Sequence, residues 1–367
     1  MIVERRLTAH IDWPLIAAVI ALSIVGLMTI YSVTFDQRNE HAGAQFWAQV
    51  YALPVGLIAL LVCMLVDYGT LTRRSIFLYA LLIVGLLAVL SVGVTRGGAR
   101  RWITVGGATL QPSEFARLVL ALVLAAFYGA HNRSPKKLMA LVAGAALLGL
   151  PAYLIYKQPD LGTAVTLIPV FLGVIYLAGV RLRWLVIAAA VAVLLSPVVW
   201  MYGLKDYQKD RIETFLDPSK DPRGEGYQQI QARVTVGSGG LMGKGFGHGT
   251  QGGYGFLPVA HNDFVYSVLA EEQGFLGVLV TLGLYLFVIL RSLMAAELAK
   301  DRVGAFLVVA IISGFAFQVL YNITMSAGLA PVKGLTLPLM SYGGSSLVAT
   351  MAGFGLILNV RMRRFTN

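Results

Sequence analysis

The feature that most constrains this chain is the recurrence of long apolar runs along its whole length. Hydrophobic residues make up 57% of the 367 residues and charged residues only 13%, whereas a soluble domain carries about 25% charged residues. Runs close to the ~20 residues that a helix needs to cross a membrane recur about ten times. The sequence therefore predicts an all-α polytopic membrane protein with about ten transmembrane helices. The expected spans are roughly 13–31, 45–66, 75–93, 112 onward, 138–156, 160–179, 183–203, 263–290, 303–325 and 343–360.

We expect residues 1–367 to form a single membrane domain. No cleavable signal peptide is expected, because the first apolar run is long enough to be a span and no A-x-A-like site clearly ends it. Cys63 is the only cysteine and lies within an apolar run. A disulfide framework and a cysteine metal site are therefore excluded.

The formal net charge of +11 could suggest a nucleic-acid partner, but the distribution of the basic residues argues against one. Basic residues concentrate in alternate loops, an asymmetry that follows the positive-inside rule and predicts that both termini lie in the cytoplasm. The loops on that side hold Arg5, Arg6, Arg73, Arg74, Arg133, Lys136, Lys137, Arg181, Arg183, Arg291, Lys300, Arg302, Arg361, Arg363 and Arg364.

One large extramembrane loop is expected between the seventh and eighth spans, at about 204–262. Its first half is charged, and its second half, 237–255, is rich in glycine. Such a segment can form tight turns against a ligand or other backbone, or it can be mobile. Loops of this length are uncommon and are usually functional or disordered.

Polar residues gather near the starts of several spans on the predicted outer face. Glu114 and Arg117 are three residues apart on one helix, so a structural ion pair is an alternative to a functional role. Asp160 follows a proline at a helix start, where capping alone would explain it. Asp263 ends the glycine-rich loop, so it is either a helix cap or a general base. At a helix N-terminus its charged form is favoured, which predicts an ionised but weak base at neutral pH.

The sequence lacks the motifs of metal-dependent hydrolases, P-loop nucleotide-binding proteins and serine hydrolases. The five histidines form no HExxH or other metal spacing. The glycine-rich stretch around Lys244 is not a phosphate-binding P-loop, and there is no GxSxG motif of a serine hydrolase. Glu271 and Glu272 lie about two turns beyond Asp263. One of them is expected to pair with a basic residue or to shape the cavity, and the alternative is a buried, partly neutral, hydrogen-bonded pair.

Seven stretches, in order along nearly the whole chain, resemble the SEDS membrane proteins (shape, elongation, division and sporulation). The elongation branch fits better than the division branch, because this sequence has no long N-terminal extension. The stretches are GARRWITVG, QPSEFAR, QPDLGTA, YQKDRIETFLDP, GYQQIQARVTVGSGGLMGKGFGHGTQ, PVAHNDFVYSVLAEEQG and KGLTLPLMSYGGSS.

The resemblance implies a peptidoglycan glycosyltransferase that polymerises lipid II at the outer face of the bacterial plasma membrane. The essential aspartate of the family falls on Asp263, and the aspartate of its QPDLG turn on Asp160. Its polar residues in the fourth span fall on Glu114 and Arg117, although the family usually has lysine at the second position. We therefore predict Asp263 as the catalytic residue. The predicted substrate contacts are Arg101, Trp102, Glu114, Arg117, Asp160, Arg211, Lys333 and Ser341.

The resemblance also implies a class B penicillin-binding protein as partner, in contact with spans eight and nine and the large loop. Basic residues such as Arg101, Arg211 and Lys333, or a bound divalent cation (Mg or Mn), would offset the pyrophosphate charge, and the sequence assigns no cofactor beyond this candidate cation. Two alternatives stay open: a flippase for the lipid-linked precursor and a non-enzymatic scaffold. A flippase would place its polar site near the midplane and would usually show inverted repeats, which this sequence lacks.

Overall fold

Apolar helices make up most of the molecule, as the sequence predicts. The computed structural model describes residues 10–36, 41–96, 99–105, 108–130, 137–203, 206–253 and 255–365. Within these ranges, eight helical segments are long and apolar enough to cross a membrane, and one of these is α6 with its π-helical continuation (Pro112–Gly129). Two more helices, α8 and α9, are apolar but have 17 residues each. The prediction of an all-α polytopic membrane protein with about ten spans is therefore confirmed. These helices are α2 (Trp13–Thr34), α3 (Ala44–Leu65), α5 (Ser75–Val92), α6 (Pro112–Ala125), α7 (Leu138–Lys157), α8 (Leu161–Leu177), α9 (Leu182–Val198), α13 (Val265–Glu297), α14 (Arg302–Ser326) and α15 (Gly344–Met362).

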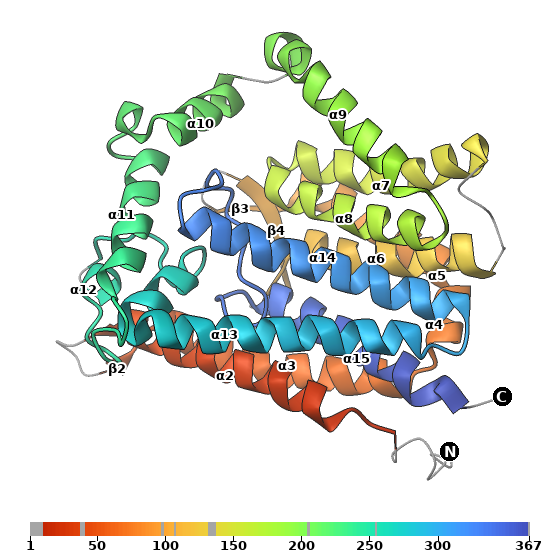
Figure 1. Cartoon of the computed structure of the whole chain (residues 1–367), viewed down its shortest axis with the longest axis horizontal. Helices are drawn as coiled ribbons and strands as arrows, with labels where there is room; N and C mark the ends of the chain where they lie inside the picture. The colour runs from red at the N-terminus through yellow and green to blue at the C-terminus, as the bar shows by residue number, and fades with distance from the viewer. Residues whose placement is uncertain are drawn as a thin grey trace.

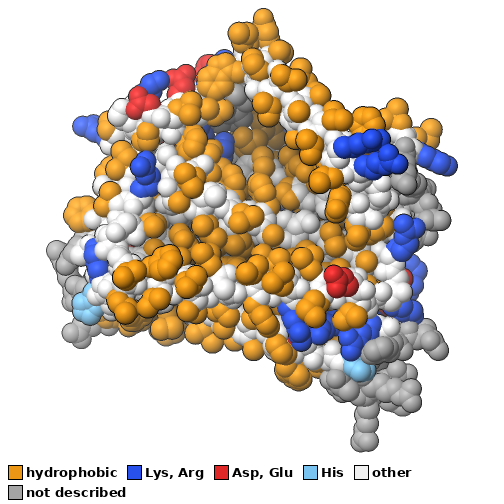
Figure 2. Space-filling view, in the orientation of Figure 1, with side chains coloured by type: hydrophobic (Ala, Val, Ile, Leu, Met, Phe, Trp, Pro, Cys, Tyr) orange, Lys and Arg blue, Asp and Glu red, His pale blue; other side chains and the backbone are white. Residues whose placement is uncertain are grey.

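The membrane-spanning helices lie roughly side by side, with α6, α14 and α15 at the centre (Figure 1). Helix α15 packs along α3 and also contacts α6 and α14, while α14 packs against α8, α13 and α6. Hydrophobic side chains cover the length of α13 on the face shown in Figure 2. An apolar outer surface of this kind is what a bilayer requires of the helices that face it.

Both ends of the described chain lie at the same end of the molecule. Asp12 caps α2, with its Oδ1 accepting from the backbone N–H of Leu15 at 3.4 Å. The same carboxylate pairs with Arg291 of α13 at 3.0 Å and with Arg361 near the end of α15 at 2.5 Å. The ion pairs tie the start of α2 to the ends of α13 and α15. The predicted cytoplasmic residues Arg5, Arg6, Arg133 and Lys136 lie outside the described residues.

The large segment between α9 and α13 contains several helices, whereas the sequence predicted only a loop. The charged first half forms α10 (Asp206–Leu216), the 3₁₀ turn η3 (Pro218–Lys220) and α11 (Glu225–Ser238). Helix α11 packs against α13, and the short helix α12 (Thr250–Gly253) contacts α2. The expected loop at about 204–262 is thus largely folded where it is described.

Helix α13 is interrupted at Gly274, where the backbone adopts φ 65° and ψ −165°. This left-handed region favours glycine because a Cβ would clash with the backbone. The break lies two residues after Glu272, so the predicted eighth span consists of a short first segment and a longer membrane-crossing segment.

A small sheet that the sequence did not predict lies between α5 and α6. Strands β3 (Val94–Arg96), β4 (Ala99–Val105) and β5 (Ala108–Leu110) pair antiparallel in that order. A second pair, β1 (Phe35–Asp36) and β2 (His41–Ala42), joins α2 to α3. The remaining short elements are α4 (Tyr68–Arg73), the π turns η1 (Ala126–Ala130) and η2 (Val199–Gly203), and the 3₁₀ turn η4 (Arg363–Phe365).

Candidate functional site

A polar pocket of about 360 Å³ lies where four helices begin. The first turns of α6, α8 and α15 contribute lining residues, and the segment before α13 contributes Asp263. Helix N-termini carry unpaired N–H groups and a partial positive charge, so their convergence favours an anionic ligand. The lining residues are Arg101, Trp102, Thr109, Gln111, Glu114, Asp160, Thr163, Val259, His261, Asn262, Asp263, Gly334, Thr336, Tyr342, Gly343, Gly344, Ser345 and Ser346.

The carboxyl group of Asp263 is almost completely buried at the wall of this pocket. Asp263 is 8% exposed, and its Oδ1 accepts a hydrogen bond from Asn262 Nδ2 at 2.9 Å. Burial raises the pKa of Asp263 to about 7, against a partial lowering of the pKa by the charge of Arg101. A carboxyl group with this pKa can exchange a proton near neutral pH.

Of the two alternatives for Asp263, the helix cap is wrong, and so is the expectation that its charged form is favoured. The N-cap position is Phe264, and no side chain caps the helix. Asp263 therefore gains no capping hydrogen bond to offset the loss of water around its charge, and desolvation dominates its pKa. The Asp263 carboxylate therefore has a higher proton affinity in the structure than the sequence predicted.

Asp160 does cap its helix and also faces the pocket. Its Oδ1 accepts from the backbone N–H of Thr163 at 3.1 Å, and its Oδ2 accepts from Gln111 Nε2 at 3.2 Å. Arg101 of β4 lies 3.7 Å from the same carboxylate and donates to the Pro159 carbonyl at 2.5 Å. The small sheet is thereby fastened to the start of α8, which brings Arg101 and its half-buried neighbour Trp102 to the pocket.

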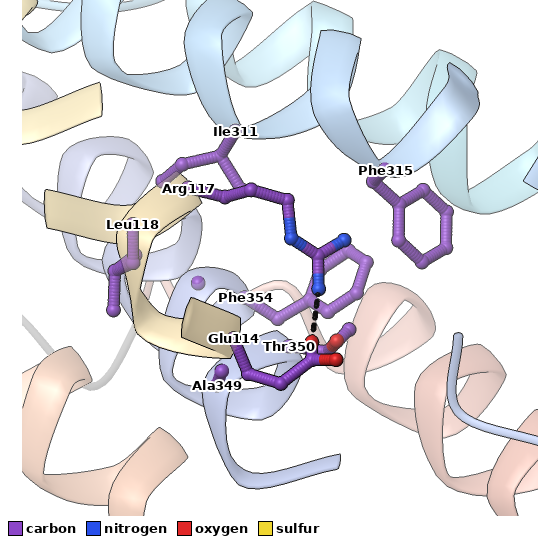
Figure 3. Close-up of a pocket in the computed structure, with 9 residues that line it drawn as sticks. Glu114, Arg117, Leu118, Ile311, Phe315, Ala349, Thr350 and Phe354 are labelled. Atoms are coloured by element: carbon purple, nitrogen blue, oxygen red, sulfur yellow. Dashed lines mark hydrogen bonds and ion pairs between the residues drawn. The ribbon is translucent and has the colours of Figure 1, made fainter. Parts of the chain in front are cut away.

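Glu114 and Arg117 form the ion pair that their spacing suggested, with 2.8 Å between Arg117 Nη2 and Glu114 Oε2. Glu114 also lines the main pocket, whereas Arg117 lies behind it in a second cavity of about 40 Å³. Figure 3 shows both side chains pointing into this cavity, with the rings of Phe315 and Phe354 beside the guanidinium group. The pair separates the polar pocket from an apolar part of the helix bundle.

Besides Arg117, three more of the predicted substrate contacts lie outside the main pocket: Arg211, Lys333 and Ser341. Arg211 of α10 pairs with Glu225 of α11 at 2.6 Å, and both charges act on the neighbouring Lys333. Burial lowers the pKa of Lys333, and the charge of Arg211 lowers it further. Ser341 is buried, and its hydroxyl accepts from the backbone N–H of Leu337 at 2.8 Å. The structure thus gives Ser341 a role in shaping the turn before α15.

Two buried amides that the sequence analysis missed hold the pocket walls in place. Asn322 of α14 is fully buried and donates to the carbonyls of Asp263 at 2.9 Å and Leu335 at 2.7 Å. One turn earlier on α14, Gln318 donates to the Thr336 carbonyl at 2.9 Å. The only sequence signal for them was two amides four residues apart in an otherwise apolar span.

Glu271 fastens the glycine-rich segment to α13. Its carboxylate is fully buried and accepts from Lys244 Nζ at 2.6 Å and from the backbone N–H groups of Thr250 at 3.0 Å and Gln251 at 3.2 Å. Glu272 is also buried and accepts from the Ser32 hydroxyl of α2. We call Glu271, Lys244, Thr250 and Gln251 the carboxylate clasp.

The described part of the chain contains no metal site built by protein side chains alone. Among the described residues, no group of three or more His, Cys, Asp or Glu side chains is arranged to hold a metal ion. Mg²⁺ is usually held by one or two carboxylates together with substrate phosphates. Asp263 in the pocket is compatible with that mode.

The fold and the pocket define a polytopic membrane protein with a buried carboxyl group in a polar pocket at one membrane face. A family model described as cell cycle protein, covering FtsW, RodA and SpoVE, matches residues 12–365. The chain therefore belongs to this family, the SEDS family that the sequence motifs indicated, and it is a multi-pass bacterial membrane protein of the RodA-like type.

Relatives with similar sequences cover almost the whole chain. The peptidoglycan glycosyltransferase MrdB of Escherichia coli (strain K12) is 34% identical over 355 residues, which cover 97% of this chain and 94% of MrdB. Among solved structures, a chain of a peptidoglycan synthase complex that coordinates polymerization and crosslinking is 33% identical, with a TM-score of 0.84 and coverage of 97% of this chain and 99% of that one. The rod shape determining protein RodA of Thermus thermophilus is 29% identical, with a TM-score of 0.73 and coverage of 97% and 98%.

Proposed function

We propose that this protein is a peptidoglycan glycosyltransferase that polymerises lipid II into glycan strands at the outer face of the plasma membrane during cell elongation. The observation that carries the proposal is the buried carboxyl group of Asp263 in the polar pocket, with its pKa raised to about 7. A general base is most effective when its pKa lies near the pH of the reaction. The name of the relative MrdB supports the same reaction.

The proposed reaction needs one base. Asp263 removes the proton from the 4-hydroxyl of the acceptor N-acetylglucosamine, and that oxygen forms a bond to the anomeric carbon of the donor N-acetylmuramic acid. The bond from this carbon to the pyrophosphate breaks, and its electron pair leaves with undecaprenyl pyrophosphate. Because pyrophosphate is already a good leaving group, the second carboxyl group that glycosidases normally use is not required.

The leaving group would lie near Arg101 and the helix starts that line the pocket. Arg101 offers a planar fork of donors suited to phosphate oxygens. The first turn of α15, with Gly344 and Ser345 at the pocket wall, presents backbone N–H groups. A divalent cation bound to the pyrophosphate would supply further charge compensation. Trp102 offers an apolar face for a sugar ring.

The remaining predicted contacts would act around the pocket. Glu114 would line the sugar site with Arg117 behind it, and Asp160 would keep Arg101 oriented. Arg211, Lys333 and the neighbouring Glu225 together have a net charge of +1. This charge would attract the acidic parts of lipid II. Ser341 would act through the turn that it stabilises.

The proposed partner is a class B penicillin-binding protein, whose transpeptidase would crosslink the new strands. The synthase complex that coordinates polymerization and crosslinking supports this pairing. The proposed orientation places both termini in the cytoplasm, in agreement with the basic residues around Asp12 and Arg361. Accessibility of C-terminal and α10 epitope tags in intact cells would test this orientation.

The test is polymerisation of lipid II by the purified protein with its partner, in the presence of moenomycin to silence other polymerases. We expect Asp263→Asn to lower the rate by at least about 100-fold, the usual contribution of a general base. Asp210→Asn, an exposed aspartate of α10, is the matched control and should keep full activity. Wild-type protein that moved lipid without forming strands would indicate a flippase, and wild-type protein that did neither would indicate a scaffold.

A further inference from the structure

A large apolar groove lies at the opposite end of the bundle from the Asp263 pocket. It has a volume of about 570 Å³ and is bounded by Leu138 and Leu141 of α7 and by Arg181, Trp184, Ile187 and Ala188 at the start of α9. Helix α8 begins at the Asp263 pocket and ends just before the groove. Its 17 residues separate the two by about 26 Å. The groove is therefore at the other membrane face.

The groove exists because α9 stands away from the bundle. None of the described side chains of α9 is buried, and Figure 1 shows the helix leaning away from α7 and α8. Leu138, Trp184 and Ile187 are 75%, 55% and 47% exposed. A volume of this size falls within the ~300–1,000 Å³ of ordinary ligand sites, so it can hold a substantial apolar group.

The mouth of the groove carries positive charge. Arg181 lines it and has no ion-pair partner within the described part of the chain. Arg183 lies over the Trp184 ring at 5.4 Å, and Lys137 immediately precedes α7. Basic side chains are visible where α7 and α9 begin (Figure 2). None of the groove-lining residues is acidic.

We propose that this groove binds an anionic phospholipid of the bilayer. The headgroup phosphate would contact Arg181 at the mouth, since guanidinium groups bind phosphate oxygens in a bidentate manner. Trp184 would lie at the level of the headgroup, where tryptophan is enriched. An acyl chain would run between Leu141 and Ile187 along the space that separates α7 from α9. The lipid would thus fill the gap that the loosely packed α9 leaves.

Tryptophan quenching tests the site in the full-length protein. The protein is placed in bilayer discs of phosphatidylcholine in two preparations. One contains brominated phosphatidylglycerol, and the other contains brominated phosphatidylcholine at the same mole fraction. The signal of Trp184 is the quenching lost in Trp184→Phe, since the chain has five tryptophans. We expect stronger quenching by the anionic lipid. Arg181→Gln should reduce the preference about fivefold, the effect of one basic residue near anionic lipid.

The control is Arg74→Gln, an exposed arginine that does not line the groove, and it should keep the preference. Equal quenching by the two brominated lipids would overturn the proposal, because the groove would then hold bulk lipid. An absence of Trp184 quenching, or a preference that survives Arg181→Gln, would also overturn it. The wild-type comparison alone decides the headgroup preference if the Arg181 variant fails to fold.

Discussion

Burial sets the chemistry of Asp263. A carboxyl group that caps a helix is held in its charged form, which is what its place in the sequence suggested. In the structure Asp263 precedes the N-cap residue and lies, almost fully buried, in the wall of the polar pocket. Its proton affinity therefore depends first on the burial that other parts of the chain impose and then on the charge of Arg101, and the sequence alone places neither.

The polymerisation rate should depend on pH through Asp263. Because the base acts only when deprotonated and its pKa is about 7, the rate should fall roughly tenfold per pH unit below about pH 7. Arg101→Gln should move the midpoint to higher pH, because the charge of Arg101 lowers the pKa of Asp263. Initial rates measured across this range test the assignment, and a flat profile in the wild-type protein would contradict it.

Asn322 is expected to position Asp263. Asn322→Leu removes two buried hydrogen bonds to the carbonyls of Asp263 and Leu335, which should cost about 1–3 kcal/mol for each carbonyl left unsatisfied. Polymerisation should fall at least about tenfold in kcat, because a base held loosely is a poorer base.

Asn359 provides a matched control for Asn322. It is equally buried and donates to the carbonyls of Met64 at 2.6 Å and Val66 at 2.8 Å, at the end of α15 remote from the pocket. Asn359 Oδ1 also accepts from the backbone N–H of Tyr68 at 3.2 Å, so Asn359→Leu should lower the melting temperature at least as much as Asn322→Leu does. It should nevertheless leave kcat of the folded fraction near the wild-type value. Equal kcat losses in both variants would indicate that Asn322 has only a structural role.

At the scale of elements, the apolar helices could be predicted and the extramembrane structure could not. About 20 consecutive apolar residues identify each span, whatever its neighbours in the sequence are. The strands β3 to β5 and the helices α10 and α11 lie in polar, glycine-containing sequence whose local signals are weak. The sheet owes its place to contacts such as the Arg101–Asp160 ion pair, which joins segments distant in sequence.

The glycine-rich segment should depend on the carboxylate clasp. Its close approach requires Gly243, where φ is 78° and a Cβ would lie 2.2 Å from the Glu272 carbonyl. Glu271→Gln weakens the contacts to Lys244 and to the backbone of Thr250 and Gln251. Hydrogen exchange at 237–253 should then become at least about tenfold faster, as one or two buried charged hydrogen bonds are lost.

Glu297→Gln serves as the control for this change, since Glu297 is an exposed residue at the far end of α13. Its exchange at 237–253 should match that of the wild-type protein. Unchanged exchange in Glu271→Gln would mean that the glycine-rich segment is held by its backbone contacts instead.

At the scale of the whole molecule, topology predicted which residues share a membrane face but not which share a pocket. Asp263, Asp160, Glu114, Arg101 and Trp102 do meet. Arg211, Lys333 and Ser341 were predicted from the same face, yet they contact other partners. The difference arises because the pocket forms where four helix starts converge, and this convergence depends on how α6, α8, α13 and α15 pack.

The burial of Asp263 also has a consequence for heat resistance. Its pKa rises from 3.8 in a solvated chain to about 7 in the folded protein, so the folded state holds the proton more tightly. The resulting stability is complete below about pH 4 and is lost as the pH rises through about 7. Asp263→Asn should therefore melt at a higher temperature than the wild-type protein at about pH 8 and at nearly the same temperature at about pH 4. The catalytically inactive variant would then be the more heat-stable protein above neutral pH. An equal difference in melting temperature between the two proteins at both pH values would refute this prediction.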